Sequence, residues 1–156
     1  MNSIFITVRS NSSRLPQKAY KKIKNKHTIE YVIDQAKKSK LADSIILCTT
    51  KRPEDDLLCE IAIKNNIQFF RGSEKDKLDR WNKACLENDI DFFVTADGDD
   101  LFCSHELMDI AFQQNQADPC DFIYSNEVVC GSFTYGISTM ALEKVCQIKN
   151  TDDTEM

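Results

Sequence analysis

Short apolar runs that alternate with amphipathic helical patterns most constrain the fold of this chain. Four runs have the length of a buried strand and lie at residues 4–8, 44–49, 67–70 and 91–95. The segments between them carry apolar residues at the i, i+3, i+4 spacing of one helical face, and they start near Thr28, Pro53 and Ser73. Because consecutive parallel strands need a crossover, usually a helix, this alternation predicts an α/β protein with a mainly parallel sheet.

The last third of the chain continues this pattern less regularly. Ser104 is expected to cap a fourth helix, and residues 121–124 are expected to form a fifth short strand. Residues 128–138 indicate a hairpin or a pair of short strands, and the last helix is expected from Thr139 to about Cys146. No internal repeat, low-complexity segment or linker interrupts the sequence, so residues 1–156 are expected to form a single domain.

Composition argues against several classes of protein. No apolar run approaches the roughly 20 residues of a membrane span, and the N-terminus shows no secretory signal. The seven cysteines are scattered without a Cys-x-x-Cys pair, and most lie in apolar runs where the thiol packs like a small hydrophobe. We therefore expect a cytoplasmic protein with no membrane partner, no disulfide framework and no zinc site.

The first strand leads directly into a polar loop rich in cations and hydroxyl groups. Residues 9–18 contain Arg9, Arg14 and Lys18 together with Ser10, Ser12 and Ser13. In α/β proteins the ligand crevice lies beyond the carboxyl ends of the strands, where backbone N–H groups and side-chain donors hold phosphate. Two guanidinium groups and one ammonium group suit a triphosphate. The alternative interpretation of the residues alone is a solvated basic loop.

Charge is unevenly distributed along the chain. Residues 1–40 hold ten Lys and Arg side chains and only two acidic ones, although the whole chain has a formal net charge of −5. A basic start could bind nucleic acid, but only Tyr20 interleaves with the lysines, and the acidic remainder would repel a polyanion. A local anion site is therefore the better interpretation, and no nucleic-acid partner is expected.

A cluster of carboxylates, Asp97-Gly98-Asp99-Asp100, follows the fourth strand. Since parallel strands end at the same edge of a sheet, these acids are expected to face the same crevice as the basic loop. Carboxylates are compatible with nearby phosphate when Mg²⁺ lies between them, and Gly98 is expected to turn the backbone tightly so that Asp97 and Asp99 both reach the ion. The alternative is a polar turn in which Asp99 or Asp100 caps the next helix.

Other polar residues give less specific patterns. Neither His27 nor His105 has a Ser or Cys partner in a recognisable motif, which argues against a hydrolase triad. From the residues alone, Asp79 and Arg80 are interpreted as an ordinary surface pair on a helix. Trp81 lies at core spacing on the same helix and is interpreted as a packing residue.

Several blocks of the sequence resemble a known family. Val8-Arg9-x-x-x-Ser13-Arg14-Leu15-Pro16-x-Lys18 resembles the N-terminal signature of bacterial cytidylyltransferases that activate sugars for surface polysaccharides. That group includes the spore coat polysaccharide type, to which the similarity is closest, and the CMP-N-acetylneuraminate and CMP-keto-deoxyoctulosonate synthetases. The block from Phe70-Arg71-Gly72-Ser73 to Asp79-Arg80-Trp81 and the strand end Thr95-Ala96-Asp97 match further parts of the spore coat type in the same order.

The resemblance implies a Rossmann-like, three-layer nucleotide-diphospho-sugar transferase fold with a mixed, mainly parallel sheet. It also implies Mg²⁺-dependent transfer of CMP from CTP to a sugar or sugar-acid acceptor, with release of pyrophosphate, for polysaccharide biosynthesis. Asp97 would bind the metal, and Asp99 could add a second ligand. The catalytic residues it implies are Arg14, Lys18 and Asp97, and the nucleotide-binding residues are Arg9, Ser12, Ser13, Arg14, Lys18, Asp79 and Arg80.

Three departures from the family pattern leave alternatives open. The loop lacks the glycines that relatives often carry near Ser12 and after Pro16, and Gly98-Asp99-Asp100 replaces a Pro-containing apolar turn. The chain is also expected to lack the family's C-terminal segment, which helps form the sugar site and often a homodimer. The alternatives are a glycosyltransferase of the related fold, with Asp97-Gly98-Asp99 as its metal motif, and a non-catalytic nucleotide-binding module.

Overall fold

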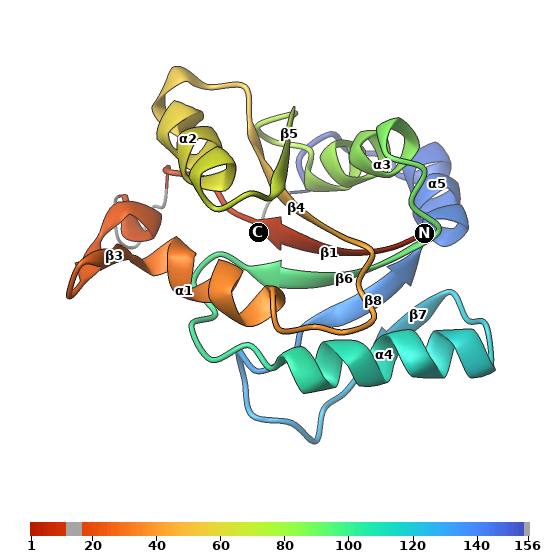
Figure 1. The fold of residues 1–156 in the computed structure, drawn as a ribbon. Coiled ribbons are helices and arrows are strands. Elements are labelled where there is room, and N and C mark those ends of the chain that lie inside the picture. The colour runs from red at the N-terminus through yellow and green to blue at the C-terminus, as the bar shows by residue number, and fades with distance from the viewer. Residues whose placement is uncertain (12–16, 155–156) are drawn as a thin grey trace.

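A six-stranded sheet forms the centre of the protein in a computed structural model, which describes residues 1–11 and 17–154 (Figure 1). Across the sheet the strand order is β5-β4-β1-β6-β8-β7. Along the chain the strands are β1 (Asn2–Thr7), β4 (Ser44–Thr50), β5 (Gln68–Gly72), β6 (Phe92–Asp97), β7 (Phe122–Tyr124) and β8 (Tyr135–Ser138). The first four of these run parallel, whereas β8 pairs antiparallel with both β6 and β7. The predicted α/β protein with a mixed, mainly parallel sheet is confirmed.

Helices connect the parallel strands. In the described part of the chain they are α1 (Thr28–Ala36), α2 (Asp56–Lys64), α3 (Lys77–Glu87), α4 (His105–Ala117) and α5 (Thr139–Ile148). Two short 3₁₀ helices and a small hairpin lie in the connections. Between β1 and α1 these are η1 (Lys18–Tyr20) and the hairpin of β2 (Lys22–Ile23) with β3 (Lys26–His27), and η2 (Pro53–Asp55) directly precedes α2. The hairpin lies on the side of the molecule toward which the β1 arrow points (Figure 1).

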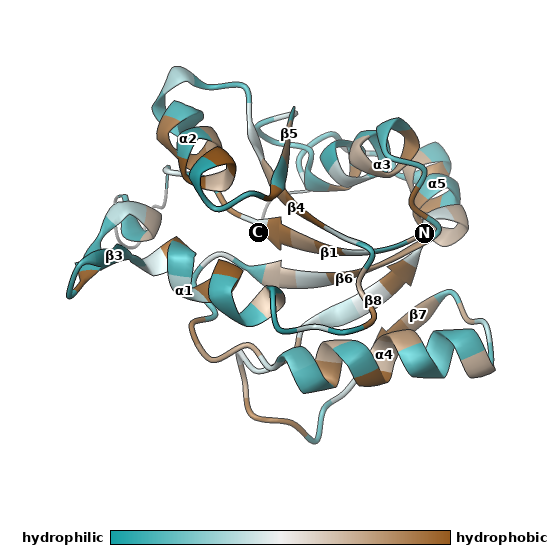
Figure 2. Ribbon diagram, in the orientation of Figure 1, coloured by the Kyte–Doolittle hydropathy of each residue, from teal (hydrophilic) through white to brown (hydrophobic). Residues whose placement is uncertain are grey.

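Side-chain alternation along the strands divides the interior into two cores, because successive residues of a strand point to opposite faces of the sheet. On one face, Ile4 and Ile6 pack with buried residues of α1, α2 and α4. On the other face, Phe5 and Phe93 pack with Trp81 of α3 and with Leu142 of α5. Figure 2 shows hydrophobic residues along the central strands and alternating hydrophilic and hydrophobic residues along the helices. The protein therefore has the expected three layers.

Local structure differs from the prediction in three places. His27, not Thr28, is the N-cap of α1, and it forms a capping box with Glu30, whose carboxylate accepts the His27 backbone N–H at 2.9 Å. The segment before α1, for which no strand was predicted, forms the β2–β3 hairpin, and Ile23 in it is 44% exposed. Of residues 128–138 only the last four form a strand, and this strand pairs with β6 and β7.

The cysteines and the helices agree with a packed globular interior. Four of the seven cysteines are buried, namely Cys48, Cys59, Cys85 and Cys103, which confirms their predicted role as small hydrophobes. Within residues 1–11 and 17–154, no helix combines the length and the apolar character needed to span a lipid bilayer.

Candidate functional site

The carboxyl ends of β1, β4 and β6 lie side by side. Thr7, the last residue of β1, is paired with Cys48 of β4 and with Asp97 of β6. The chain segments that follow β1 and β6 therefore leave the sheet at one edge, which confirms that the start of the basic loop and the acidic cluster meet there. The two segments are in direct contact, because the Lys18 ammonium group forms an ion pair with the Asp99 carboxylate.

The described cations of the basic loop are Arg9, which is partly buried, and Lys18. The Lys18 side chain is about one-third exposed and that of Asp99 is 44% exposed, so both groups remain accessible from the crevice. Ser12, Ser13 and Arg14 lie outside the described residues, and their assignments to phosphate binding stay predictions.

The acidic cluster forms a tight turn after β6. The Asp100 N–H donates to the Asp97 carbonyl oxygen at 2.9 Å, and the Gly98 N–H donates to the Thr7 carbonyl oxygen at 2.8 Å. Burial, followed by the charges of Asp97 and Asp99, raises the pKa of Asp100 to about 6. Ser104 is the N-cap of α4 and accepts the Leu107 N–H at 3.2 Å, so the alternative in which Asp99 or Asp100 caps this helix is wrong.

This concentration of carboxylates fits a divalent cation. Burial is the main cause of the raised pKa of Asp100, and a cation between Asp97 and Asp99 would offset the smaller contribution of their charges. Within the described ranges, no three His, Cys, Asp or Glu side chains are arranged around one metal position. Mg²⁺ suits such a site, because it commonly takes one or two protein carboxylates and completes its octahedron with water and substrate phosphate oxygens.

Gly98 is required for close packing and not for an unusual backbone angle. Gly98 lies in the expected tight turn, but its backbone conformation does not require glycine, because Gly131 is the glycine with positive φ among the described residues. A Cβ atom on Gly98 would lie 2.6 Å from Cβ and 2.7 Å from Cγ2 of Val8. The absence of a side chain at Gly98 thus lets the turn after β6 pack directly against the first residue after β1.

Gly98→Ala is expected to destabilise the protein by about 1–3 kcal/mol, because the new methyl group overlaps Val8 in a closely packed region. Urea denaturation of both proteins measures the difference. Val8→Gly removes both colliding atoms, Cβ and Cγ2, so the double variant should lose less stability than the sum of the two single losses. A Gly98→Ala variant as stable as wild type would contradict the packing explanation.

The Asp79–Arg80 pair is divided between surface and interior. The Asp79 carboxylate forms an ion pair with the Lys83 ammonium group on the outer side of α3, with 2.9 Å between Oδ2 and Nζ. Arg80 is fully buried, and its Nη1 donates to the Ser73 carbonyl oxygen at 2.6 Å. Arg80 also packs under Gly72, where a Cβ atom would lie 2.7 Å from its Cγ. The surface-pair interpretation is therefore wrong for Arg80, and the part of both residues in nucleotide binding stays a prediction.

Asp55, near the predicted helix start at Pro53, is not among the site residues expected from the sequence, yet it lies at this edge of the sheet. Its side chain is fully buried and does not cap α2. Instead, its carboxylate accepts hydrogen bonds from Ser10 and from the strand end Thr49–Thr50. No pattern in Pro53-Glu54-Asp55-Asp56 marks the third residue as the buried one.

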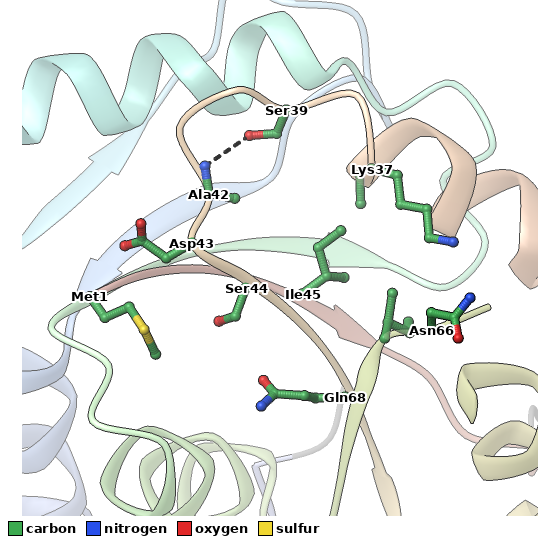
Figure 3. Close-up of a pocket in the computed structure, with 11 residues that line it drawn as sticks. Met1, Lys37, Ser39, Ala42, Asp43, Ser44, Ile45, Asn66 and Gln68 are labelled. Carbon is green, nitrogen blue, oxygen red and sulfur yellow. Dashed lines mark hydrogen bonds between the residues drawn. The ribbon is translucent and has the colours of Figure 1, made fainter. Parts of the chain in front are cut away.

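A shallow hollow of about 460 Å³ lies at the opposite edge of the sheet (Figure 3). It is formed by the end of α1, the start of β4 and the residues before β5, including Lys37, Asp43, Ile45 and Gln68. It contains none of the residues assigned to phosphate or metal binding. Because ligands of α/β proteins bind beyond the carboxyl ends of the strands, we assign the site to the other edge.

Comparison with known proteins identifies the family. The sequence profile of a family described as cytidylyltransferase matches residues 4–155. The chain belongs to the cytidylyltransferase family. A solved cytidylyltransferase from Leptospira borgpetersenii superposes with a TM-score of 0.91 at 25% identity, over 97% of this chain and 66% of that one. A CMP-2-keto-3-deoxy-manno-octonic acid synthetase complexed with CTP shares the fold, with a TM-score of 0.76 at 15% identity over 96% of this chain and 79% of that chain.

Two curated relatives are similar in sequence to most of this chain. An uncharacterised protein of Methanocaldococcus jannaschii is 32% identical over 89% of this chain and 57% of its own length. The spore coat polysaccharide biosynthesis protein SpsF of Bacillus subtilis is 26% identical over 98% of this chain and 66% of its own length. The chain thus spans less than two thirds of either relative. The predicted resemblance to sugar-activating cytidylyltransferases and the predicted fold are confirmed.

Proposed function

We propose that this chain forms the nucleotide-binding part of a Mg²⁺-dependent enzyme that transfers CMP from CTP to a sugar or sugar-acid acceptor and releases pyrophosphate. The observation that carries the proposal is the meeting of Lys18 with Asp99, beside Asp97, at the carboxyl edge of the parallel sheet. Membership of the cytidylyltransferase family supports the choice of nucleotide. The similarity to SpsF supports a role in cell-surface polysaccharide biosynthesis.

The proposed chemistry needs positioning and charge neutralisation more than it needs a protein nucleophile. The oxygen of an acceptor hydroxyl group attacks the α-phosphorus of CTP and loses its proton to solvent, the bond from that phosphorus to the bridging oxygen breaks, and pyrophosphate leaves with its electron pair. Arg9 and Lys18 would hold the triphosphate, with Arg14 assigned to the same role from the sequence, and Asp97 and Asp99 would hold Mg²⁺. Mg²⁺ would neutralise the charge that develops on the leaving pyrophosphate. The residues of this chain would keep attacking and leaving oxygens in line.

Calorimetric titration with CTP, UTP, GTP and ATP, each with and without Mg²⁺, tests the proposal. We expect selective binding of CTP that Mg²⁺ strengthens. Preference for a uridine nucleotide would instead favour the glycosyltransferase alternative, for which Asp97-Gly98-Asp99 supplies a metal motif. No binding of any nucleotide would contradict both readings of the site.

Lys18→Ala is expected to weaken CTP binding by about ten- to a hundredfold, since a hydrogen bond from a charged donor contributes about 1.5–3 kcal/mol. The same titration measures this loss. Lys22→Ala is a matched control, because Lys22 is an exposed lysine of the nearby β2–β3 hairpin with no assigned ligand role. Equal CTP affinity of the Lys18 and Lys22 variants would contradict the phosphate assignment of Lys18.

A further inference from the structure

Asp55 links the three chain segments that meet at the carboxyl edge. Its Oδ1 accepts the backbone N–H of Ser10 at 2.8 Å. Its Oδ2 accepts the Thr49 hydroxyl at 3.0 Å, the Thr50 N–H at 3.2 Å and the Thr50 hydroxyl. The carboxylate therefore ties the segment after β1 to the end of β4 and to the start of α2.

Ser10 connects Asp55 to Gln17, near the other end of the basic loop. The Ser10 carbonyl oxygen accepts the Gln17 N–H at 3.1 Å, so the residues next to Arg9 and Lys18 are bonded to each other. Gln17 has φ of +56°, a left-handed conformation that is uncommon for a residue with a side chain and needs support from its surroundings. The bond to Ser10, which Asp55 holds in turn, provides such support.

A second contact anchors the same region to η2. The Tyr20 hydroxyl donates to the Glu54 carbonyl oxygen at 2.6 Å, and the Thr28 hydroxyl donates to the Lys18 carbonyl oxygen at 2.7 Å. Burial, followed by the charge of Asp55, raises the pKa of Tyr20 to about 12, so the phenol keeps its proton and remains a donor at neutral pH. The backbone of Lys18 is thus held from α1, and the neighbouring Tyr20 is held from η2.

The hydrogen bonds to Asp55 favour its ionised form at neutral pH. Burial alone would raise the pKa of this carboxyl group, but the hydrogen bonds from Ser10, Thr50 and Thr49 hold its pKa below the ordinary value. A fully buried carboxylate is costly unless such donors compensate it. The Asp55 carboxylate does not serve as a helix cap, because it accepts no hydrogen bond from the first turn of α2.

We propose that Asp55 is a positioning residue that holds Arg9 and Lys18, through Ser10 and Gln17, in place for the triphosphate. This inference rests on the proposed function for the identity of the ligand, but the attachment itself is independent of it. Asp55 reaches the basic loop through the backbone N–H of Ser10, and its fully buried side chain is not exposed to a ligand. It should therefore affect recognition of the phosphates and leave recognition of the nucleoside unchanged.

The affinity ratio between CTP and cytidine tests this role. Asp55→Asn places an amide donor against groups that are themselves donors, so we expect CTP affinity to fall about tenfold or more while cytidine affinity stays within about twofold. Asp56→Asn is the matched control: Asp56 is the next residue, its side chain is 59% exposed, and it pairs with Arg71 at 2.7 Å. NMR titration of wild type and both variants measures the two affinities. An equal loss for CTP and cytidine, or no loss for either, would overturn the proposal.

Hydrogen exchange of the nucleotide-free wild-type protein gives a test that needs neither a folded variant nor CTP binding. We expect the Ser10 and Gln17 amides to exchange at least about a hundredfold more slowly than an unstructured amide, because opening them requires release of the Asp55 contacts. Exchange at the unstructured rate would overturn the attachment. Wild-type protein that protects these amides but binds no CTP would contradict the proposed function and leave the attachment supported.

Discussion

Asp97→Asn is expected to lower the rate of CMP transfer by about a hundredfold or more, equivalent to about 2.7 kcal/mol of transition-state stabilisation. Asp97 is the last residue of β6, and its pairing with Thr7 holds its backbone beside the end of β1. Asparagine has the same shape but no charge, so the fold should persist while the affinity for Mg²⁺ falls. Pyrophosphate release, measured with an active acceptor over a range of Mg²⁺ concentrations, should show both the lower rate and a higher requirement for Mg²⁺.

Asp91→Asn is the control for this experiment. Asp91 immediately precedes β6 at the other edge of the sheet, where its side chain is 86% exposed and forms an ion pair with the N-terminal ammonium group. Removal of an exposed pair of this kind costs about 0–1 kcal/mol of stability and should leave transfer within about twofold of wild type. If the Asp97 and Asp91 variants have equal rates, Asp97 does not bind the catalytic metal.

The layout of the sheet could be predicted because it depends on patterns that are continuous in sequence. The four parallel strands were expected from apolar runs. The ends of each run agree with the ends of the observed strand to within two residues. The boundary error at the end of β6 is informative. Its hydrophobic run ends at Thr95, but Asp97 still pairs with Thr7, since backbone hydrogen bonding does not depend on an apolar side chain.

The position of the candidate site was predictable for the same reason, whereas the roles of individual polar residues were not. Parallel topology alone places Asp97 and the residues after β1 at one edge. The direction of a charged side chain depends on tertiary contacts instead. Arg80 and Asp55 both occupy positions that look exposed on a helix or at a helix start, yet both are fully buried. Their partners include backbone groups of Ser73 and Ser10, which carry no recognisable sequence signature.

Trp81→Ala is expected to destabilise the protein by about 3–5 kcal/mol, as is typical when a large buried aromatic side chain is removed. Trp81 is 1% exposed and contacts Phe93 and Tyr135 edge-to-face, with ring centroids 5.8 and 6.1 Å apart. Its Nε1 donates to the Thr7 hydroxyl at 2.8 Å, which connects α3 to the end of β1. Since the free energy of unfolding of a domain is typically about 5–15 kcal/mol, this loss should remove a large part of the stability of the protein. Urea denaturation followed by circular dichroism measures it.

Two further variants separate packing from the hydrogen bond. Trp81→Phe keeps an aromatic ring but removes the donor to Thr7. The stability that it loses should be smaller than the loss in the alanine variant but larger than the roughly 1 kcal/mol of a single hydrogen bond. Leu86→Ala, on the same helix but 56% exposed, should cost less than about 1 kcal/mol. Equal stabilities of the Trp81→Ala and Leu86→Ala variants would contradict the central position of Trp81. Because Thr7 adjoins Asp97 across the ladder, the phenylalanine variant should also weaken Mg²⁺-dependent CTP binding, whereas the Leu86 variant should not.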